Sequence, residues 1–175
     1  MWDNKLVSEV LFFATKNHSG QKMMYPENMP YSAHFTGVML NAIKYALLDD
    51  ENLDWDVLIC CALLHDVVED CEIKLEEIKE RFGEKIANGV NALTKNEALK
   101  KEDKMSDSLL RIKKCGKEIA IVKMADRFFN IRDRVPTWTK EKQENYLIES
   151  KLILKELGKF SQPIAKALKE AIKNY

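Results

Sequence analysis

The sequence has no excess charge of either sign. Its 28 lysine and arginine residues are matched by 28 aspartate and glutamate residues, so the formal net charge at pH 7 is zero. A strongly basic chain attracts nucleic acids or anionic membranes through its overall field, and this chain has no such field. We therefore expect no nucleic-acid or membrane partner, and an anionic ligand must be held by a local cluster of basic side chains.

Long apolar runs and paired cysteines are also missing. No stretch approaches the ~20 apolar residues that a membrane-spanning helix needs. Residues 1–5 lead into an amphipathic segment and not into the apolar core of a secretory signal. Cys60, Cys61, Cys71 and Cys115 show no CxxC spacing. We interpret them as reduced thiols and expect a cytoplasmic protein.

The chain also lacks strand patterns: no convincing period-two alternation, internal repeat or domain boundary is present. Apolar residues recur instead with helical spacing, and 175 residues of which 46% are apolar suffice for one domain with a sizeable core. Helices are expected over residues 6–17, 33–47, 57–68, 75–82, 85–93, 106–114, 118–133, 141–157 and 163–174. Residues 95–104 are charged and form either a solvated helix or a mobile loop. The sequence predicts one compact all-α domain over residues 1–175, with about eight to ten helices.

Residues 62–70 (ALLHDVVED) end a strongly apolar helix with ionisable side chains. Burying His65 and Asp66 is costly unless something compensates them, and a metal ion is the usual compensator. Glu69 and Asp70 follow these two residues by four positions, which places each one helical turn onward over the same site. The alternative is an acidic helix end with a surface histidine, but three carboxylates at a helix C-terminus oppose the helix dipole. The pattern favours a metal site.

Two further polar residues lie in apolar surroundings. Asp126 lies within an apolar helix and shares its face with Lys123 and Asn130. Taken alone, Asp126 is better interpreted as a buried, salt-bridged aspartate. His34 begins a helix after a proline-containing loop, and by itself it is better interpreted as a structural histidine.

Six segments together carry a family resemblance. They are residues 14–21, 30–34, 62–70, 75–83, 93–95 and 121–130. In this order they resemble the HD superfamily, and within it the (p)ppGpp hydrolase domain of RelA/SpoT proteins and their small stand-alone relatives. The pattern HDxxED, followed downstream by KxAD and an asparagine, is far more specific than an HD dipeptide alone. The resemblance covers nearly the whole chain and implies an all-helical metallohydrolase.

The resemblance assigns a metal site and a catalytic pair. The implied metal ligands are His34, His65, Asp66 and Asp126. Two imidazoles and two carboxylates suit one six-coordinate divalent ion, with Mn²⁺ first and Fe²⁺ or Zn²⁺ as alternatives. Glu69 and Asp70 are the implied catalytic pair, and either could be the general base. The implied reaction removes the 3′-pyrophosphate from a guanosine nucleotide.

Candidate substrate contacts lie elsewhere on the chain. The resemblance places Asn130 among them, and a tyrosine near the base pocket of the family corresponds to Tyr146, for which surface packing is an alternative. Lys95 and Lys123 are candidates to meet the diphosphate charge, with Arg127 as a further one. Their alternatives are a solvated lysine for Lys95 and helix salt bridges for Lys123 and Arg127. We interpret His18 as structural and Trp138 as a core or helix-end anchor.

The chain departs from the family after Gly20-Gln21. The family has an arginine there that helps to hold the guanine base, and here Met23 occupies its position beside Lys22. A methionine can pack on a base, but it donates no hydrogen bond and makes no cation–π contact. Lys22 remains a candidate base contact. The first hypothesis is therefore a (p)ppGpp 3′-pyrophosphohydrolase. An HD phosphohydrolase for another nucleotide or phosphomonoester, or a nucleotide-binding module without turnover, is the alternative, although the intact ligand set argues against the last.

Overall fold

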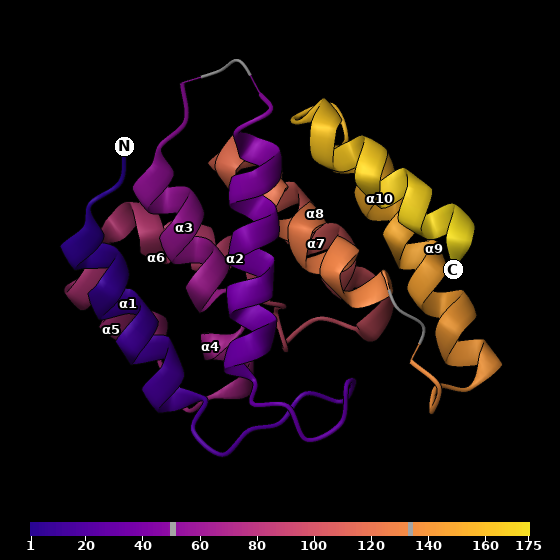
Figure 1. Cartoon of the computed structure of the whole chain (residues 1–175), viewed down its shortest axis with the longest axis horizontal. Helices are drawn as coiled ribbons and strands as arrows, with labels where there is room; N and C mark the ends of the chain where they lie inside the picture. Colours follow the sequence, from indigo (N-terminus) through magenta and orange to yellow (C-terminus); the bar gives the residue numbers. More distant parts are fainter. Residues whose placement is uncertain (50–51, 133–134) are drawn as a thin grey trace.

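The computed structural model describes residues 1–49, 52–132 and 135–175. In these ranges it contains ten α-helices and no β-strand beyond one isolated bridge between Lys22 and Pro30 (Figure 1). The helices are α1 (Asn4–Asn17), α2 (Ser32–Ala46), α3 (Trp55–Leu64), α4 (Val67–Asp70), α5 (Leu75–Phe82), α6 (Glu84–Leu93), α7 (Lys101–Cys115), α8 (Lys117–Ile131), α9 (Lys140–Leu157) and α10 (Gln162–Asn174). The predicted all-α fold is confirmed. Within the described ranges, no helix combines the length and the apolar composition of a membrane span.

Local signals in the sequence set several helix ends. The Asp3 carboxylate accepts hydrogen bonds from the first backbone N–H groups of α1, and the Asp54 side chain does the same for α3. Thr139 caps α9 through its hydroxyl oxygen. These side chains satisfy N–H groups that a helix leaves unpaired at its start. Gly83 and Gly116 separate consecutive helices with φ angles of 89° and 107°, a backbone conformation that favours glycine.

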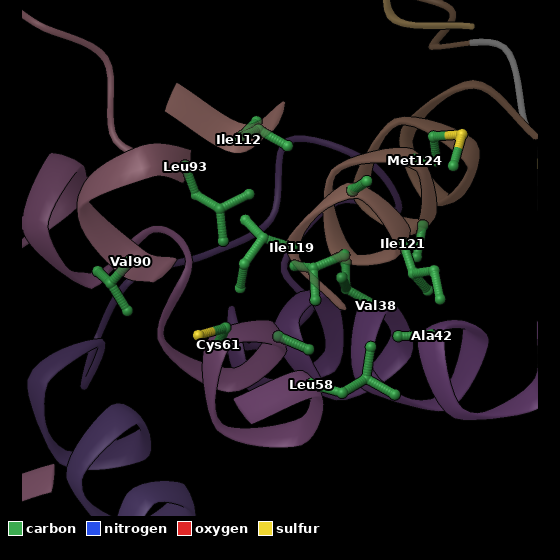
Figure 2. Packing of buried hydrophobic residues seen from close by; sticks show 14 of the residues in the cluster. Val38, Ala42, Leu58, Cys61, Val90, Leu93, Ile112, Ile119, Ile121 and Met124 are labelled. Carbon is green, nitrogen blue, oxygen red and sulfur yellow. The ribbon is translucent and has the colours of Figure 1, made fainter. Parts of the chain in front are cut away.

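The core is centred on α3, whose residues from Leu58 to Leu64 are all buried. Figure 2 shows side chains of α2, α3, α6, α7 and α8 gathered in one apolar cluster, with Ile119 near its middle and Leu58 and Cys61 along its lower edge. Helices α2 and α8 pack on α3 and on each other. The rigid centre of the fold therefore includes the helices that carry the four predicted metal ligands or lead directly to them.

Helices α2 and α8 approach each other closely at Gly37. A Cβ atom at this position would overlap the ring of Phe129 on α8, so only glycine fits here without a shift. Gly37 lies three residues after His34, and Phe129 lies three residues after Asp126. This close approach therefore brings the two predicted ligands on α2 and α8 towards the same point.

Two sequence-based predictions about helix boundaries were wrong. The helix predicted over 57–68 is two helices, because α3 ends at Leu64 and α4 begins at Val67. At the break the Nδ1–H group of His65 donates a hydrogen bond to the carbonyl oxygen of Ala62 at 2.8 Å, which gives this carbonyl near the helix end a partner. Residues 94–100 form a non-helical connection, and α7 begins at Lys101, five residues before the predicted start. The predicted end of the 118–133 helix lies outside the described residues.

Candidate active site

The four predicted metal ligands lie together. His34 comes from the first turn of α2, His65 and Asp66 from the turn between α3 and α4, and Asp126 from α8. The Nε2 atoms of His34 and His65 are 3.1 Å apart. The Oδ2 atom of Asp66 lies 3.4 Å and 3.0 Å from these two nitrogens. The Oδ1 atom of Asp126 lies 3.7 Å and 3.8 Å from them. Segments that are far apart in the sequence therefore gather these four side chains in one cluster, in which the ligand atoms of His34, His65 and Asp66 all lie within 4.8 Å of one another.

The chemistry of these four groups fits a divalent cation. Because the Nδ1–H group of His65 donates a hydrogen bond to the carbonyl oxygen of Ala62, Nε2 is the ring nitrogen that would bind a metal, which takes the place of a proton there. Burial alone lowers the pKa of His65, but the charge of Asp66 raises it to about 9. Burial alone raises the pKa of Asp66, but the imidazole of His65 holds it well below its usual range. The negative charges of Asp66 and Asp126 thus favour a positive charge between the two imidazoles, and a divalent ion would supply it.

Neighbouring side chains fix the orientation of the carboxylates. The Tyr31 hydroxyl donates a hydrogen bond to Oδ2 of Asp66. Asn130 donates through Nδ2 to Oδ1 of Asp126 at 2.6 Å, and the Lys123 ammonium lies 3.3 Å from Oδ2 of the same carboxylate. Such partners of metal ligands hold them in place and tune their affinity. Tyr31 was not among the residues predicted for the site, although its position three residues before His34, at the N-cap of α2, was an available signal.

A cavity of about 590 Å³ opens onto this cluster. Its lining includes the following residues that the sequence analysis selected: Met23, His34, Asp66, Glu69, Lys95, Lys123, Asp126, Arg127, Asn130, Trp138 and Tyr146. His65 lies behind this wall, with 3% of its surface exposed. The basic side chains of the lining are Lys95, Lys101, Lys104, Lys123, Arg127 and Arg132. A chain without net charge therefore gathers a local basic cluster beside the candidate metal ligands.

The structure separates the two members of the predicted catalytic pair. Glu69 lines the cavity, where its carboxylate accepts hydrogen bonds from the backbone N–H of Lys95 at 2.6 Å and from the Lys95 ammonium at 3.3 Å. Asp70 is absent from the lining, and its Oδ2 accepts a hydrogen bond from the Gln21 amide at 2.8 Å. The expectation that both lie over the site assumed a continuous helix. The break at His65 removes the basis of that spacing argument.

The loop between α1 and α2 presents Met23, and not Lys22, to the cavity. Lys22 is exposed and lies outside the lining, so the structure does not bring it to the site as the sequence analysis expected. His18 is buried, donates through Nδ1 to the Gln21 side-chain oxygen at 2.6 Å, and stacks on Tyr31 with ring centroids 4.7 Å apart. These contacts agree with the structural role expected for His18.

An aromatic wall closes the cavity on the side of α9. The guanidinium of Arg127 lies 3.8 Å from the centroid of the Tyr146 ring and forms an ion pair with Glu149 at 2.9 Å. Arg127 therefore supports this wall by contacting Tyr146 and pairing with Glu149. A salt bridge was the alternative to a substrate contact for Arg127. Trp138 contacts Tyr146 with ring centroids 4.7 Å apart, and its indole N–H points at the sulfur of Met24 at 3.0 Å. Trp138, interpreted from sequence as an anchor, thus also lines the cavity.

Comparisons with known proteins agree with this geometry. The guanosine-3′,5′-bis(diphosphate) 3′-pyrophosphohydrolase MESH1 of Drosophila melanogaster is 29% identical over 153 residues, which are 85% of this chain and 83% of that protein. The Homo sapiens MESH1 is 27% identical over 169 residues, or 94% and 92% of the two chains. A solved structure, described as a metazoan ortholog of SpoT that hydrolyses ppGpp, superposes with a TM-score of 0.85 at 25% identity and covers 99% of this chain and 97% of the other. The family model of the HD domain matches residues 11–159, and the chain therefore belongs to the HD domain family.

Proposed function

We propose that this protein is a metal-dependent guanosine-3′,5′-bis(diphosphate) 3′-pyrophosphohydrolase. The observation that carries the proposal is a cavity lined by His34, Asp66, Asp126, the Glu69 carboxylate and six basic side chains, with the fourth metal-type ligand, His65, buried 3.0 Å from Asp66. The MESH1 relatives named for this reaction are similar over most of both chains, which supports the same substrate class here. A cytoplasmic location is part of the proposal, because all four cysteines are free thiols.

We propose that the four ligands hold one divalent ion. Mixed nitrogen and oxygen ligands favour Mn²⁺, with Fe²⁺ and Zn²⁺ as alternatives. When bound, such an ion polarises a phosphoryl oxygen and lowers the pKa of water in the site. Asn130 and Lys123 hold the Asp126 carboxylate in its orientation. In this scheme the two residues therefore position a metal ligand in addition to contacting the substrate.

Glu69 is the general base in this proposal. Its carboxylate takes a proton from the attacking water, whose oxygen bonds to the phosphorus next to the ribose 3′ oxygen. The ester bond to that oxygen breaks, a proton returns to it, and the products are pyrophosphate and guanosine 5′-diphosphate. Lys95 holds Glu69 by its backbone N–H and its ammonium. Burial alone lowers the pKa of Lys95, but Glu69 raises it above the ordinary value, so the ammonium stays charged beside the diphosphate.

A product assay tests the proposal. Protein loaded with Mn²⁺ is expected to convert guanosine 3′,5′-bis(diphosphate) to guanosine 5′-diphosphate and pyrophosphate in equal amounts, detected by ion-exchange chromatography. Release of single phosphates, or turnover only of other nucleotides in a parallel panel, would reject the pyrophosphohydrolase assignment and leave a phosphohydrolase of different specificity.

One observation favours a second candidate, a phosphohydrolase with broader base recognition. Met23 and Met24 line the cavity, Met23 at the position where the family resemblance implies an arginine, and Trp138 and Tyr146 form the adjoining wall. Sulfur and aromatic surfaces pack on any base, because they contribute contact area and few directed hydrogen bonds. The metal end of the pocket is the same for both candidates.

Met23→Arg separates the two candidates. The substitution is expected to tighten binding of guanine nucleotides by up to about thirtyfold, because a planar cationic partner for a base contributes about 0.5–2 kcal/mol. The measurement compares KM for guanosine and adenosine 3′,5′-bis-diphosphates on the wild type and the variant. Met29→Arg, in the same loop but outside the cavity lining, is the matched control. A strong guanine preference in the wild type that Met23→Arg leaves unchanged would show that other groups recognise the base.

A further inference from the structure

The first turn of α7 forms a part of the cavity wall that the metal chemistry does not use. Lys101 and Lys104 both line the cavity and lie three residues apart, so their side chains share one face of the helix. The candidate metal ligands come from α2, α8 and the turn between α3 and α4. This first turn therefore adds two cations to the pocket from a separate helix.

Lys104 already binds an anionic group in this structure. Its side chain is only 19% exposed, and its ammonium lies 2.5 Å from a carboxylate oxygen of Glu97. The Glu97 side chain is 80% exposed and belongs to the non-helical connection between α6 and α7. An ion pair with so exposed a partner contributes little to stability, so a more highly charged anion entering the cavity can take the place of the carboxylate.

The backbone at the start of α7 also favours an anion. Its N-cap residue is Lys100, which makes no side-chain hydrogen bond to the first turn. The first N–H groups of the helix therefore have no side-chain acceptor from the cap, and they form the positive end of the helix dipole. Glu102 and Asp103 also lie in this turn, but both are exposed and neither lines the cavity.

The substrate of the proposed function carries two diphosphates, and the metal cluster with Lys95 and Lys123 accounts for one. We infer that Lys101 and Lys104 form a second anion subsite that holds the 5′-diphosphate, and that Glu97 is the carboxylate which this diphosphate displaces. The inference rests on the proposed function for the identity of the ligand. It assigns a specificity role to the first turn of α7, because only a nucleotide with a 5′-diphosphate offers these two lysines an anion in addition to the diphosphate at the metal cluster.

The test compares two nucleotides with the same 3′-diphosphate. Guanosine 3′,5′-bis(diphosphate) has the 5′-diphosphate, and guanosine 3′-diphosphate has a 5′-hydroxyl. For the Lys101→Ala/Lys104→Ala double variant, KM for the first nucleotide is expected to rise about tenfold per lost charge-assisted hydrogen bond. KM for the second nucleotide and kcat for both are expected to stay within about twofold of the wild type, a margin well below that tenfold effect. Lys100→Ala removes one lysine charge at a neighbouring position outside the cavity and is the control for each of the two substitutions.

Glu97→Gln tests the inference in the opposite direction. Without the competing carboxylate, KM for the bis-diphosphate is expected to fall by about two- to fivefold, a range set by the weakness of an exposed ion pair. Equal changes for both nucleotides in the double variant, or no change for either, would overturn the subsite. If the wild type hydrolyses neither nucleotide, the proposed function fails. The ratio of the two dissociation constants, measured by calorimetry on the same variants, then still decides whether the subsite exists.

Discussion

Glu69→Gln is expected to lower kcat by about two to four orders of magnitude, the usual loss when a general base is removed. The amide keeps the size of the side chain and can still accept a hydrogen bond from the backbone N–H of Lys95, so the local fold should be retained. It cannot take a proton from water. Steady-state hydrolysis of guanosine 3′,5′-bis(diphosphate) measures the loss, and elemental analysis should find the metal content of the wild type.

Asp70→Asn is the matched control for this prediction. Asp70 is the neighbouring carboxylate, lies outside the cavity lining and accepts its hydrogen bond from Gln21. Its neutral variant is expected to lose far less activity than Glu69→Gln. The assignment of the base would be wrong if Asp70→Asn were the more damaging change, or if Glu69→Gln turned over substrate at a near-normal rate.

Asp66→Ala is expected to abolish both metal binding and activity. The Asp66 carboxylate lies within 3.4 Å of the Nε2 atoms of His34 and His65, so its removal deletes a ligand and half of the local negative charge that Asp66 and Asp126 supply. Changes to residues that only support a ligand cost about 10–100-fold in metal affinity, and loss of the ligand itself should exceed this range. Elemental analysis after dialysis against Mn²⁺ measures the result.

Asp107→Ala controls for the loss of an aspartate elsewhere. Asp107 is a partly buried carboxylate on α7 that pairs with Arg111 and lies outside the cavity. This variant should keep its metal. Stoichiometric metal in Asp66→Ala, at wild-type affinity, would mean that the ion binds at a different place from the one proposed here.

Much of the site was predictable from the sequence because its ligands interrupt apolar helices. His65 and Asp66 stand out at the end of α3, and Asp126 stands out within α8, since few polar groups are tolerated in such surroundings without a partner. His34 carried no such signal by itself. The ligand roles of His34 and Asp126 both came from the family resemblance, because Asp126 taken alone was better interpreted as a salt-bridged aspartate, and the structure places both beside His65 and Asp66.

The parts that sequence reasoning missed depend on tertiary contacts. Apolar periodicity continues from α3 through Val67 and Val68, so nothing in the pattern marked the break at His65, beyond which Glu69 lines the cavity and Asp70 pairs with Gln21 outside it. The first turn of α7 is too polar to show a helical face, so the pattern of residues 95–104 does not distinguish a solvated helix from a loop. Only the tertiary structure shows that Lys101 and Lys104 line the cavity, because the sequence pattern does not distinguish them from exposed lysines.

The origin of the four ligands on separate segments has a thermodynamic consequence. The unfolded chain holds His34, the His65–Asp66 pair and Asp126 far apart, so it cannot offer an ion the same set of ligands. An ion that binds only the folded protein stabilises it by about 2.7 kcal/mol when its free concentration is a hundred times its Kd. The supply of divalent metal in the cell would therefore govern how much of this protein is folded as well as how much of it is active.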